Sequence, residues 1–302
     1  MQTQPIDFQP PAEAAAFLLP VKTSLFAARA DRFATLAAGH SLGDWLAFLG
    51  QLTRAQHGAL QALPELPLPD AATLAQAHSH GMPPLNASSL AHPARWRDVL
   101  RQLATTLGPD APDAARHTLA VLAAADDAHL ENLADALLGG TAEADDVAAL
   151  PFVAAALQVV FTAQACKLAA SQLQMLDVHG VCPCCGSLPV ASVVRLGAAI
   201  NNLRYLHCSL CNTEWNVPRA VCTTCETDKG VALHEVEGSN GAVRAETCDS
   251  CKSYLKIVYQ EKDPNVDPVA DDLATLALDL LVDEAGYERA GPNLLLIGAH
   301  SG

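Results

Sequence analysis

Aromatic residues and basic charge are both scarce in this chain of 302 residues. Phe, Trp and Tyr make up only 5% of it, while Ala and Leu dominate the hydrophobic half. That composition favours packed helices over β-sandwiches or barrels. Lys and Arg number 18 against 33 Asp and Glu, and the formal charge of -15 is spread over both halves. Nucleic acids and anionic membranes repel such a surface, so a basic protein segment is the electrostatically favoured partner.

Sequence motifs for catalysis are also missing. The chain contains no H-E-x-x-H, G-x-x-x-x-G-K-[ST], G-x-S-x-G or G-x-G-x-x-G pattern. It therefore lacks the signatures of a catalytic zinc site, a phosphate loop, a serine nucleophile and a dinucleotide fold. We predict that the protein is not an enzyme.

One uncharged run, residues 147–166, has the length of a membrane span. It contains Pro151, Gln158, Thr162 and Gln164 among weakly apolar alanines, so we interpret it as a buried core helix. The N-terminus has neither a cationic region nor an uninterrupted apolar one, and so does not resemble a signal peptide. These features predict a cytoplasmic protein without membrane insertion.

The first half of the chain predicts a helical bundle. Proline clusters separate Ala/Leu-rich segments, as prolines do at helix boundaries. The clearest predicted helices cover residues 95–107, where apolar residues recur at three- and four-residue spacing, and residues 112–138, which end before two glycines. We expect about five to seven helices in this half.

The composition changes near residue 180, where valines, aromatics and cysteines replace alanine. Strand-like runs follow at Val190 to Leu196 and Leu203 to His207. A C-terminal helix is expected to start at Asp267-Pro268, a suitable N-cap and first residue, and to end near Gly286. Its apolar face would consist of Val269, Leu273, Leu276 and Leu280.

Nine of the ten cysteines fall between residues 182 and 251, and eight of them form four C-x-x-C pairs with a period of 40 residues. This period indicates an internal duplication. Two residues between cysteines let a tight turn direct both sulfurs at one cation, and two such turns complete a tetrahedral shell. We predict two metal sites with the pairs combined in sequence order, and a cross-braced pairing is the alternative. The predicted ligands are Cys182, Cys185, Cys208 and Cys211 in the first site and Cys222, Cys225, Cys248 and Cys251 in the second.

The spacing does not identify the metal, because zinc and iron both accept four thiolates in a tetrahedron. Structural zinc is favoured by the spacing alone, since metal binding would stabilise small modules with thin cores. Thiol–disulfide exchange is the competing use of C-x-x-C, but it usually needs only one motif.

Other cysteines and histidines near the pairs are not predicted ligands. Cys184 is a spare ligand, a redox group or, as we favour, a bystander, and Cys166 is interpreted as a small buried hydrophobe. His179, His207 and His234 are expected in supporting or surface positions, because the cysteine sets are complete without them.

The predicted fold class is α+β and multidomain. Residues 1–178 would form an α-helical bundle, residues 179–220 and 221–262 two tandem rubredoxin-like or zinc-ribbon tetra-cysteine modules, and residues 263–302 a C-terminal helix and tail.

The run from Cys182 to Tyr287 resembles the formate dehydrogenase accessory protein family, FdhE. The matching stretches are CPCCGSLPVASVV, LRYLHCSLCNTEWNVPR, CTTC, CDSC and SYLKIVYQEKDPNVDPVADDLATLALD. The helical first half fits the family more loosely, in length and character. Cys184 departs from the family pattern, which typically has a non-cysteine residue there.

The resemblance implies a cytoplasmic assembly factor that binds the catalytic subunit of formate dehydrogenase before export by the twin-arginine route. Our further hypothesis, from charge, is that the acidic helical body contacts the basic twin-arginine signal segment. It also implies iron, held in a rubredoxin-like manner by the eight paired cysteines, and zinc remains the alternative. Whether the protein is a homodimer stays open.

Two other functions are compatible with the sequence. One is a redox or sulfur-transfer protein that acts on formate dehydrogenase. The other is a nucleic-acid-binding zinc-ribbon protein, which the balance of seven basic and seven acidic residues in 180–260 disfavours. The aromatics that would stack on bases suit ribbon cores better, and they are Tyr205, Trp215, Tyr254 and Tyr259.

Overall fold

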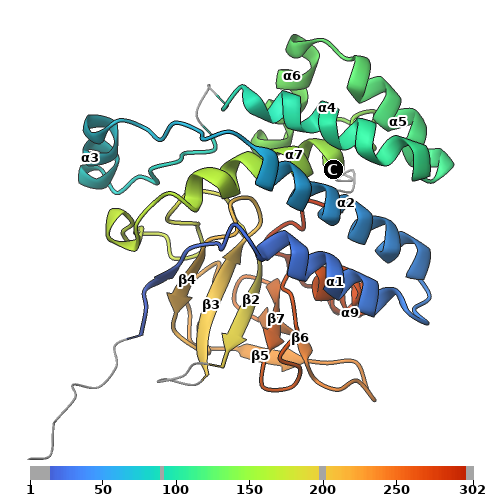
Figure 1. Ribbon diagram of the computed structural model, residues 1–302. Helices are drawn as coiled ribbons and strands as arrows, with labels where there is room; N and C mark the ends of the chain where they lie inside the picture. The colour runs from blue at the N-terminus through green and yellow to red at the C-terminus, as the bar shows by residue number, and fades with distance from the viewer. Residues whose placement is uncertain (1–13, 89–91, 197–201, 297–302) are drawn as a thin grey trace, which may run out of the picture.

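The computed structural model describes residues 14–88, 92–196 and 202–296. The first 13 residues, which contributed to the prediction of a cytoplasmic protein, lie outside these ranges. Figure 1 shows the helices of the N-terminal part on one side of the molecule and strands β2 to β7 on the other. The α+β class is confirmed, with helices first, then two tetra-cysteine groups on one sheet, then further helices.

Seven α-helices form the N-terminal part that the structure describes, as expected. Helix α4 has the predicted bounds, but the single helix predicted over residues 112–138 is wrong, because the chain breaks there into α5 and α6. Asp126 is extended at the break and its side chain accepts the N–H of His129 at 2.8 Å, an N-cap that starts a new helix. The helices are α1 (Leu25–Ala37), α2 (Gly43–Ala62), α3 (Ala71–Ser79), α4 (Arg95–Leu107), α5 (Asp113–Ala124), α6 (Asp127–Gly139) and α7 (Leu150–Ala165).

Helix α7 passes through the core, and nearly all of its residues are buried. Its polar side chains have partners there: Gln158 donates to the Ser209 carbonyl at 2.7 Å, and the Thr162 hydroxyl accepts from Asn212 at 2.8 Å. The prediction of a buried core helix is confirmed. Within the described ranges, no helix has both the length and the apolar character that crossing a membrane requires.

One eight-stranded sheet forms the other layer, in the order β1-β4-β3-β2-β7-β6-β5, with β8 beside β7. The strand runs predicted to begin at Val190 and Leu203 are confirmed to within one residue. Strands β2 to β4 form the first antiparallel ribbon and β5 to β7 the second. The strands are β1 (Phe17–Leu18), β2 (Pro189–Arg195), β3 (Leu203–Cys208), β4 (Glu214–Val217), β5 (Val231–His234), β6 (Val243–Cys248), β7 (Ser253–Tyr259) and β8 (Glu288–Arg289).

The two ribbons share an edge. Strands β2 and β7 pair in parallel, with Val193 opposite Val258. Arg204 on β3 reaches across this seam to Glu246 on β6 at 2.6 Å, and both side chains are nearly buried. The sheet is therefore continuous through both ribbons, and the domain boundary at residue 220 stays a prediction.

The C-terminal helix is broken into α8 (Ala270–Leu273) and α9 (Leu276–Glu284). The predicted start at Asp267-Pro268 is too early, because α8 begins at Ala270 with Val269 at its N-cap position. Asp267 still binds this end of the helix, since Oδ1 accepts the N–H groups of Val269 and Ala270 at 2.9 and 2.8 Å. The prediction of one apolar face that includes Leu280 is wrong, because the Leu280 side chain is 67% exposed. Helix α9 instead buries Leu278 and Val282.

Ion pairs join this C-terminal segment to helix α1. Arg29 donates through Nε to Asp267 at 3.0 Å, and Arg32 pairs with Asp271 at 2.5 Å. Arg29 is fully buried. The first helix, the sheet and the C-terminal segment therefore meet in one packed region.

Candidate metal centres and the adjoining cavity

Folding brings the eight predicted ligands together in two groups of four. The first group joins the turn before β2 to the turn after β3, and the second joins the turn before β5 to the turn after β6. Within each group the Sγ atoms lie within 4.8 Å of one another. The groups contain the pairs in sequence order, so that prediction is confirmed and the cross-braced alternative is wrong.

The distances between sulfurs fit a metal better than a disulfide. The Sγ atoms of Cys182 and Cys211 are 3.6 Å apart, and those of Cys185 and Cys208 are 3.4 Å apart. Both corresponding distances in the second group are 3.6 Å. A disulfide bond is about 2.05 Å long, whereas sulfurs about 2.3 Å from one tetrahedral ion lie about 3.8 Å apart. Four sulfur donors fit zinc and iron equally.

The turns of the two groups repeat the same backbone geometry 40 residues apart. Gly186 and Glu226 both have a left-handed backbone, with φ of 82° and 58°. Asn212 and Lys252 do so in the second turn of each group, with φ of 59° and 56°. This conformation costs a non-glycine residue free energy, so its repetition shows that the C-x-x-C turn itself requires it. The duplication inferred from the sequence thus extends to backbone torsion angles.

The first centre is enclosed by the helical part. Its four cysteines have no exposed surface. The N–H groups of Leu85 and Ala87 donate to the carbonyls of Cys184 and Cys185 at 2.9 Å each. Gln158 of α7 binds the second turn from the other side. This centre therefore lies within the main core of the molecule.

The second centre lies at the surface. Cys222 and Cys248 are nearly buried, but Cys225 is exposed and Cys251 is half-buried. The first turn of this centre is joined to the segment before Cys182, because the Glu226 side chain accepts the N–H of His179 at 3.1 Å. A metal at this centre would be close to solvent or to a docked protein.

Burial opposes ionisation of the thiols. It raises the pKa of Cys182 and Cys208 well above the usual value, together with the neighbouring thiols. Burial acts in the same direction on Cys211, but hydrogen bonds from the surrounding thiols outweigh it and lower the pKa of Cys211. At Cys225 a backbone hydrogen bond favours the thiolate, yet desolvation and the neighbouring thiols raise its pKa to about 12. A cation that binds must therefore displace protons from most of these sulfurs.

The neighbouring histidines lie outside both groups, as expected. His207 is buried, and its Nδ1 is 2.8 Å from Glu214. His179 pairs with Glu226, and the Nε2 of His234 is 3.0 Å from the Thr247 hydroxyl.

The two remaining cysteines also lie outside both groups. Cys184 is fully buried, next to the first centre. The prediction of a buried Cys166 is wrong in degree, because this residue follows α7 as its C-cap and is only half-buried, with Sγ 3.2 Å from the Pro20 carbonyl.

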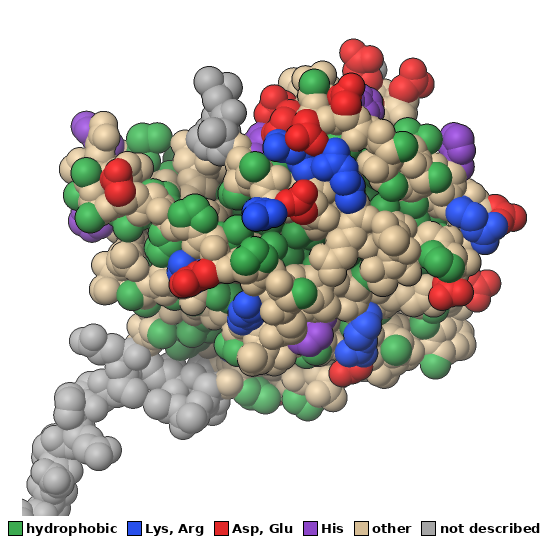
Figure 2. Space-filling view, turned by 45° about the horizontal axis from the view of Figure 1, so that its top comes forward, with side chains coloured by type: hydrophobic (Ala, Val, Ile, Leu, Met, Phe, Trp, Pro, Cys, Tyr) green, Lys and Arg blue, Asp and Glu red, His purple; other side chains and the backbone are tan. Residues whose placement is uncertain are grey.

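The aromatics weighed for nucleic-acid stacking are buried in the ribbon cores, as favoured from the sequence. Figure 2 shows acidic and basic side chains interspersed over the helical part rather than a dominant basic patch on this face. The relative exposures are 3% for Tyr205, 0% for Trp215, 4% for Tyr254 and 8% for Tyr259.

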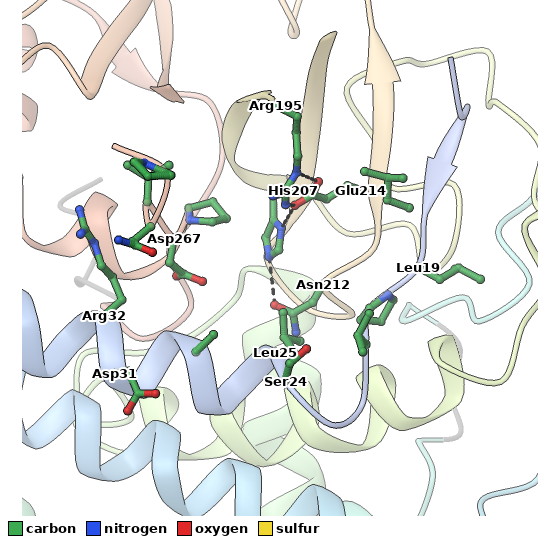
Figure 3. A pocket seen from close by; sticks show the side chains of 18 of the residues that line it. Leu19, Ser24, Leu25, Asp31, Arg32, Arg195, His207, Asn212, Glu214 and Asp267 are labelled. Atoms are coloured by element: carbon green, nitrogen blue, oxygen red, sulfur yellow. Dashed lines mark hydrogen bonds and ion pairs between the residues drawn. The ribbon is translucent and has the colours of Figure 1, made fainter. Parts of the chain in front are cut away.

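A cavity of about 940 Å³ lies beside the first centre (Figure 3). Glu214 lies between Arg195 and His207 on its floor and binds both, at 2.8 Å from the Nε of Arg195. Burial alone would raise the pKa of Glu214, but the His207 hydrogen bond and the Arg195 charge lower it to about 2. Arg29 donates from behind the floor to Asn212 Oδ1 at 3.0 Å. This polar network lies directly behind the turn that carries Cys208 and Cys211.

This cavity is a feature of the fold that no sequence pattern predicts. Its walls come from residues 17–35, from both ends of the first ribbon and from residues 264–268. No pattern in the sequence links these segments, and only the tertiary fold brings them together.

The fold and the two centres define a class of protein in which a helical domain is joined to a duplicated tetra-cysteine ribbon. Three family models match the chain in order: "FdhE, N-terminal" over residues 14–177, "FdhE, central domain" over 181–219 and "FdhE, C-terminal domain" over 220–296. The chain belongs to the FdhE family.

Relatives and a solved structure agree over nearly the whole chain. A "Protein FdhE homolog" of Edwardsiella ictaluri is 42% identical over 286 residues, which cover 93% of this chain and 91% of the relative. One from Serratia proteamaculans is 41% identical and covers 90% and 88%. The crystal structure of the FdhE protein from Pseudomonas aeruginosa is similar with a TM-score of 0.85 and 37% identity, covering 95% of this chain and all of that one.

Proposed function

We propose that this chain is a cytoplasmic assembly factor, a dedicated chaperone that binds the catalytic subunit of formate dehydrogenase before its export by the twin-arginine route. Membership of the FdhE family supports this function. The observation that carries it is the contrast between the two centres: one is enclosed in the core, and its duplicate is open on the same continuous sheet. A rigid sheet with an open centre offers a partner protein a preformed surface.

We further propose that the eight paired cysteines hold two metal ions, iron in a rubredoxin-like manner, with zinc as the alternative. The sulfur geometry supports two tetrahedral sites. A bound metal would supply four-fold cross-links that stabilise each ribbon. In the first centre it would also join the ribbon to α7 through the turn that Gln158 contacts.

This function is binding rather than turnover. In this proposal all eight paired cysteines are metal ligands, which leaves none of them free to act as a nucleophile. On the cavity floor, Arg195 and His207 both bind Glu214. These arrangements support a non-enzymatic role.

A redox or sulfur-transfer role on the same dehydrogenase is the second candidate. Exposure of Cys225 favours it, because an accessible sulfur permits electron or thiol exchange with a partner. Turnover with a thiol or sulfur donor would distinguish this role from chaperone binding.

The experiment is a pull-down from the protein's own cells with the native chain, the Cys182→Ser variant, the Cys222→Ser variant and the Cys166→Ser variant as baits. Cys166 is a matched control, because it is a cysteine outside both groups. We expect the native chain and Cys166→Ser to capture the formate dehydrogenase catalytic subunit, and Cys222→Ser to capture much less.

Cys182→Ser tests the first centre in the same assay, with circular dichroism to separate loss of fold from loss of surface. Equal capture by all four baits would contradict a role for the metal centres. Capture of nucleic acid or unrelated proteins alone would contradict the proposed partner.

A further inference from the structure

We propose that the cavity beside the first centre binds an extended segment of a partner polypeptide, in which an arginine or lysine side chain is flanked by apolar residues. The proposal rests on the proposed function in that the partner is a protein client. It adds the place of contact and the chemistry of the contacted segment.

Size and position suit a peptide. A volume of about 940 Å³ is at the upper end of the range for ligand pockets, about 300–1,000 Å³, and such pockets prefer junctions between structural units. This cavity lies where α1, the first ribbon and the segment before α8 meet. A bound segment would therefore touch all three parts of the fold at once.

One wall of the cavity is an edge strand. Phe17 and Leu18 of β1 line it, and β1 is the terminal strand of the sheet in the described part of the chain, paired there with β4. An edge strand offers main-chain N–H and C=O groups to an incoming strand. Extended backbone is therefore the conformation that this wall recognises.

The same side of the cavity is apolar. Leu19, Pro20 and Val21 continue the wall after β1, and Leu25 of α1 and Val266 face the same space. Val21 is 59% exposed although it is a large aliphatic side chain. Apolar side chains of the bound segment would cover this surface and gain hydrophobic free energy.

Carboxylates select a basic side chain. Asp267 lines the cavity, and in the described ranges its Oδ2 accepts one hydrogen bond, from Arg29 at 3.1 Å, so it retains acceptor capacity. Asp31, whose side chain is 72% exposed, also lines the cavity and is paired with Arg54 at the surface. Such an exposed pair contributes little and yields easily to another cation.

The charge balance of the cavity agrees with this choice. Three carboxylates line the cavity against two guanidinium groups, which leaves one net negative charge with His207 neutral, within a chain of charge -15. The carboxylates are Asp31, Glu214 and Asp267, and the guanidinium groups are Arg32 and Arg195.

One bound segment would reach both the β1 edge and Asp267. In Figure 3, Leu19 lies on one side of the cavity and Asp267 on the opposite side, with His207 and Asn212 between them. A segment paired with β1 would extend a long side chain across this floor toward Asp267. Arginine and lysine have the length and the charge for that contact.

The experiment is a fluorescence anisotropy titration of the full chain with a short labelled peptide of alternating threonine and valine that carries one central arginine. A second peptide has glutamate in place of the arginine. The test variant is Ala28→Trp, because Ala28 is an exposed residue of α1 that lines the cavity. The matched control is Ala34→Trp, an exposed position of the same helix outside the cavity lining.

We expect the arginine peptide to bind the native chain and Ala34→Trp equally, and Ala28→Trp about tenfold or more weakly. Asp31→Asn should weaken binding about two- to fivefold, with less loss at high salt. Hydrogen exchange at the β1 amides should slow when the peptide binds. Equal binding of both peptides, or equal binding to Ala28→Trp, would overturn the proposal.

Capture of the catalytic subunit by the same variants separates this proposal from the proposed function. If the native chain captures the subunit and Ala28→Trp captures it equally well, the cavity is not the contact and the assembly function stands. If the peptide binds as expected and no variant captures the subunit, the cavity stands and the proposed client is wrong.

Discussion

The two cysteine centres have the same local geometry and opposite surroundings. Both use two C-x-x-C turns with left-handed residues at equivalent positions. The first is packed beneath α7 and the segment that contains Leu85 and Ala87, whereas the second leaves Cys225 exposed. Duplication therefore preserved the ligand set, and the role of each copy depends on what packs against it. We infer that the first centre stabilises the fold and that the second is the exchangeable one.

The largest expected effect comes from breaking each centre separately. Cys182→Ser removes a ligand inside the main core and leaves buried thiols without a shared cation, so we expect a loss of about 5 kcal/mol or more of unfolding free energy. Cys222→Ser should cost about 1–2 kcal/mol globally and unfold the second ribbon locally. Urea unfolding with hydrogen exchange measures both. Equal global losses would contradict the assigned difference.

A smaller effect is expected at the seam between the ribbons. Arg204→Met leaves Glu246 buried without its partner, and such a change typically costs about 3–5 kcal/mol. Burial already raises the pKa of Glu246. Arg244→Met, which breaks a partly exposed pair with Glu235 on the second ribbon, is the matched control and should cost about 0–1 kcal/mol.

The double variant Arg204→Met with Glu246→Leu should recover most of the Arg204→Met loss, because no buried charge remains. Thermal unfolding of the four proteins measures these differences. If Arg204→Met lowers the free energy of unfolding no more than Arg244→Met does, the Arg204–Glu246 pair does not hold the two ribbons together.

The smallest expected effect concerns pH. Glu214 has a pKa lowered from 4.5 to about 2 in the folded protein, so its stabilisation is complete above pH 4.5 and is lost as the pH falls toward 2. The shift corresponds to about 3 kcal/mol. Glu214→Gln should remove that stabilisation at neutral pH and flatten the acid limb of the stability curve. An unchanged acid limb in Glu214→Gln would contradict the assignment.

Local patterns in the sequence predicted the local structure well. The bounds of α4 and the starts of β2 and β3 follow from periodicity, and the grouping of the eight cysteines follows from the 40-residue repeat. The breaks at Asp126 and Thr275 were missed, because a cap or a local turn interrupts an apolar pattern that otherwise continues. Capping competes with helix propagation over a few residues and leaves little trace in composition.

Contacts between distant segments were not predictable from the sequence. The polar residues Gln158 and Thr162 indicated a core helix rather than a membrane helix. Nothing in the sequence indicated that they bind the second turn of the first centre. Arg29 belongs to no sequence motif, yet its side chain joins α1 to Asn212 and Asp267. The difference in exposure between the two centres has the same origin, since it depends on which helices pack over each ribbon.

The most direct test of the difference between the centres is the rate at which each releases its metal to a chelator. The purified chain is loaded with metal and mixed with a chelator whose metal complex is coloured. The variants Cys182→Ser and Cys222→Ser, each of which lacks one ligand of one centre, show which centre gives rise to each kinetic phase. We predict two phases, in which the metal of the second centre leaves fast and that of the first leaves only as the protein unfolds, and Cys222→Ser lacks the fast phase. A single phase, or a fast phase that survives in Cys222→Ser, would contradict the claim that the second centre is the exchangeable one.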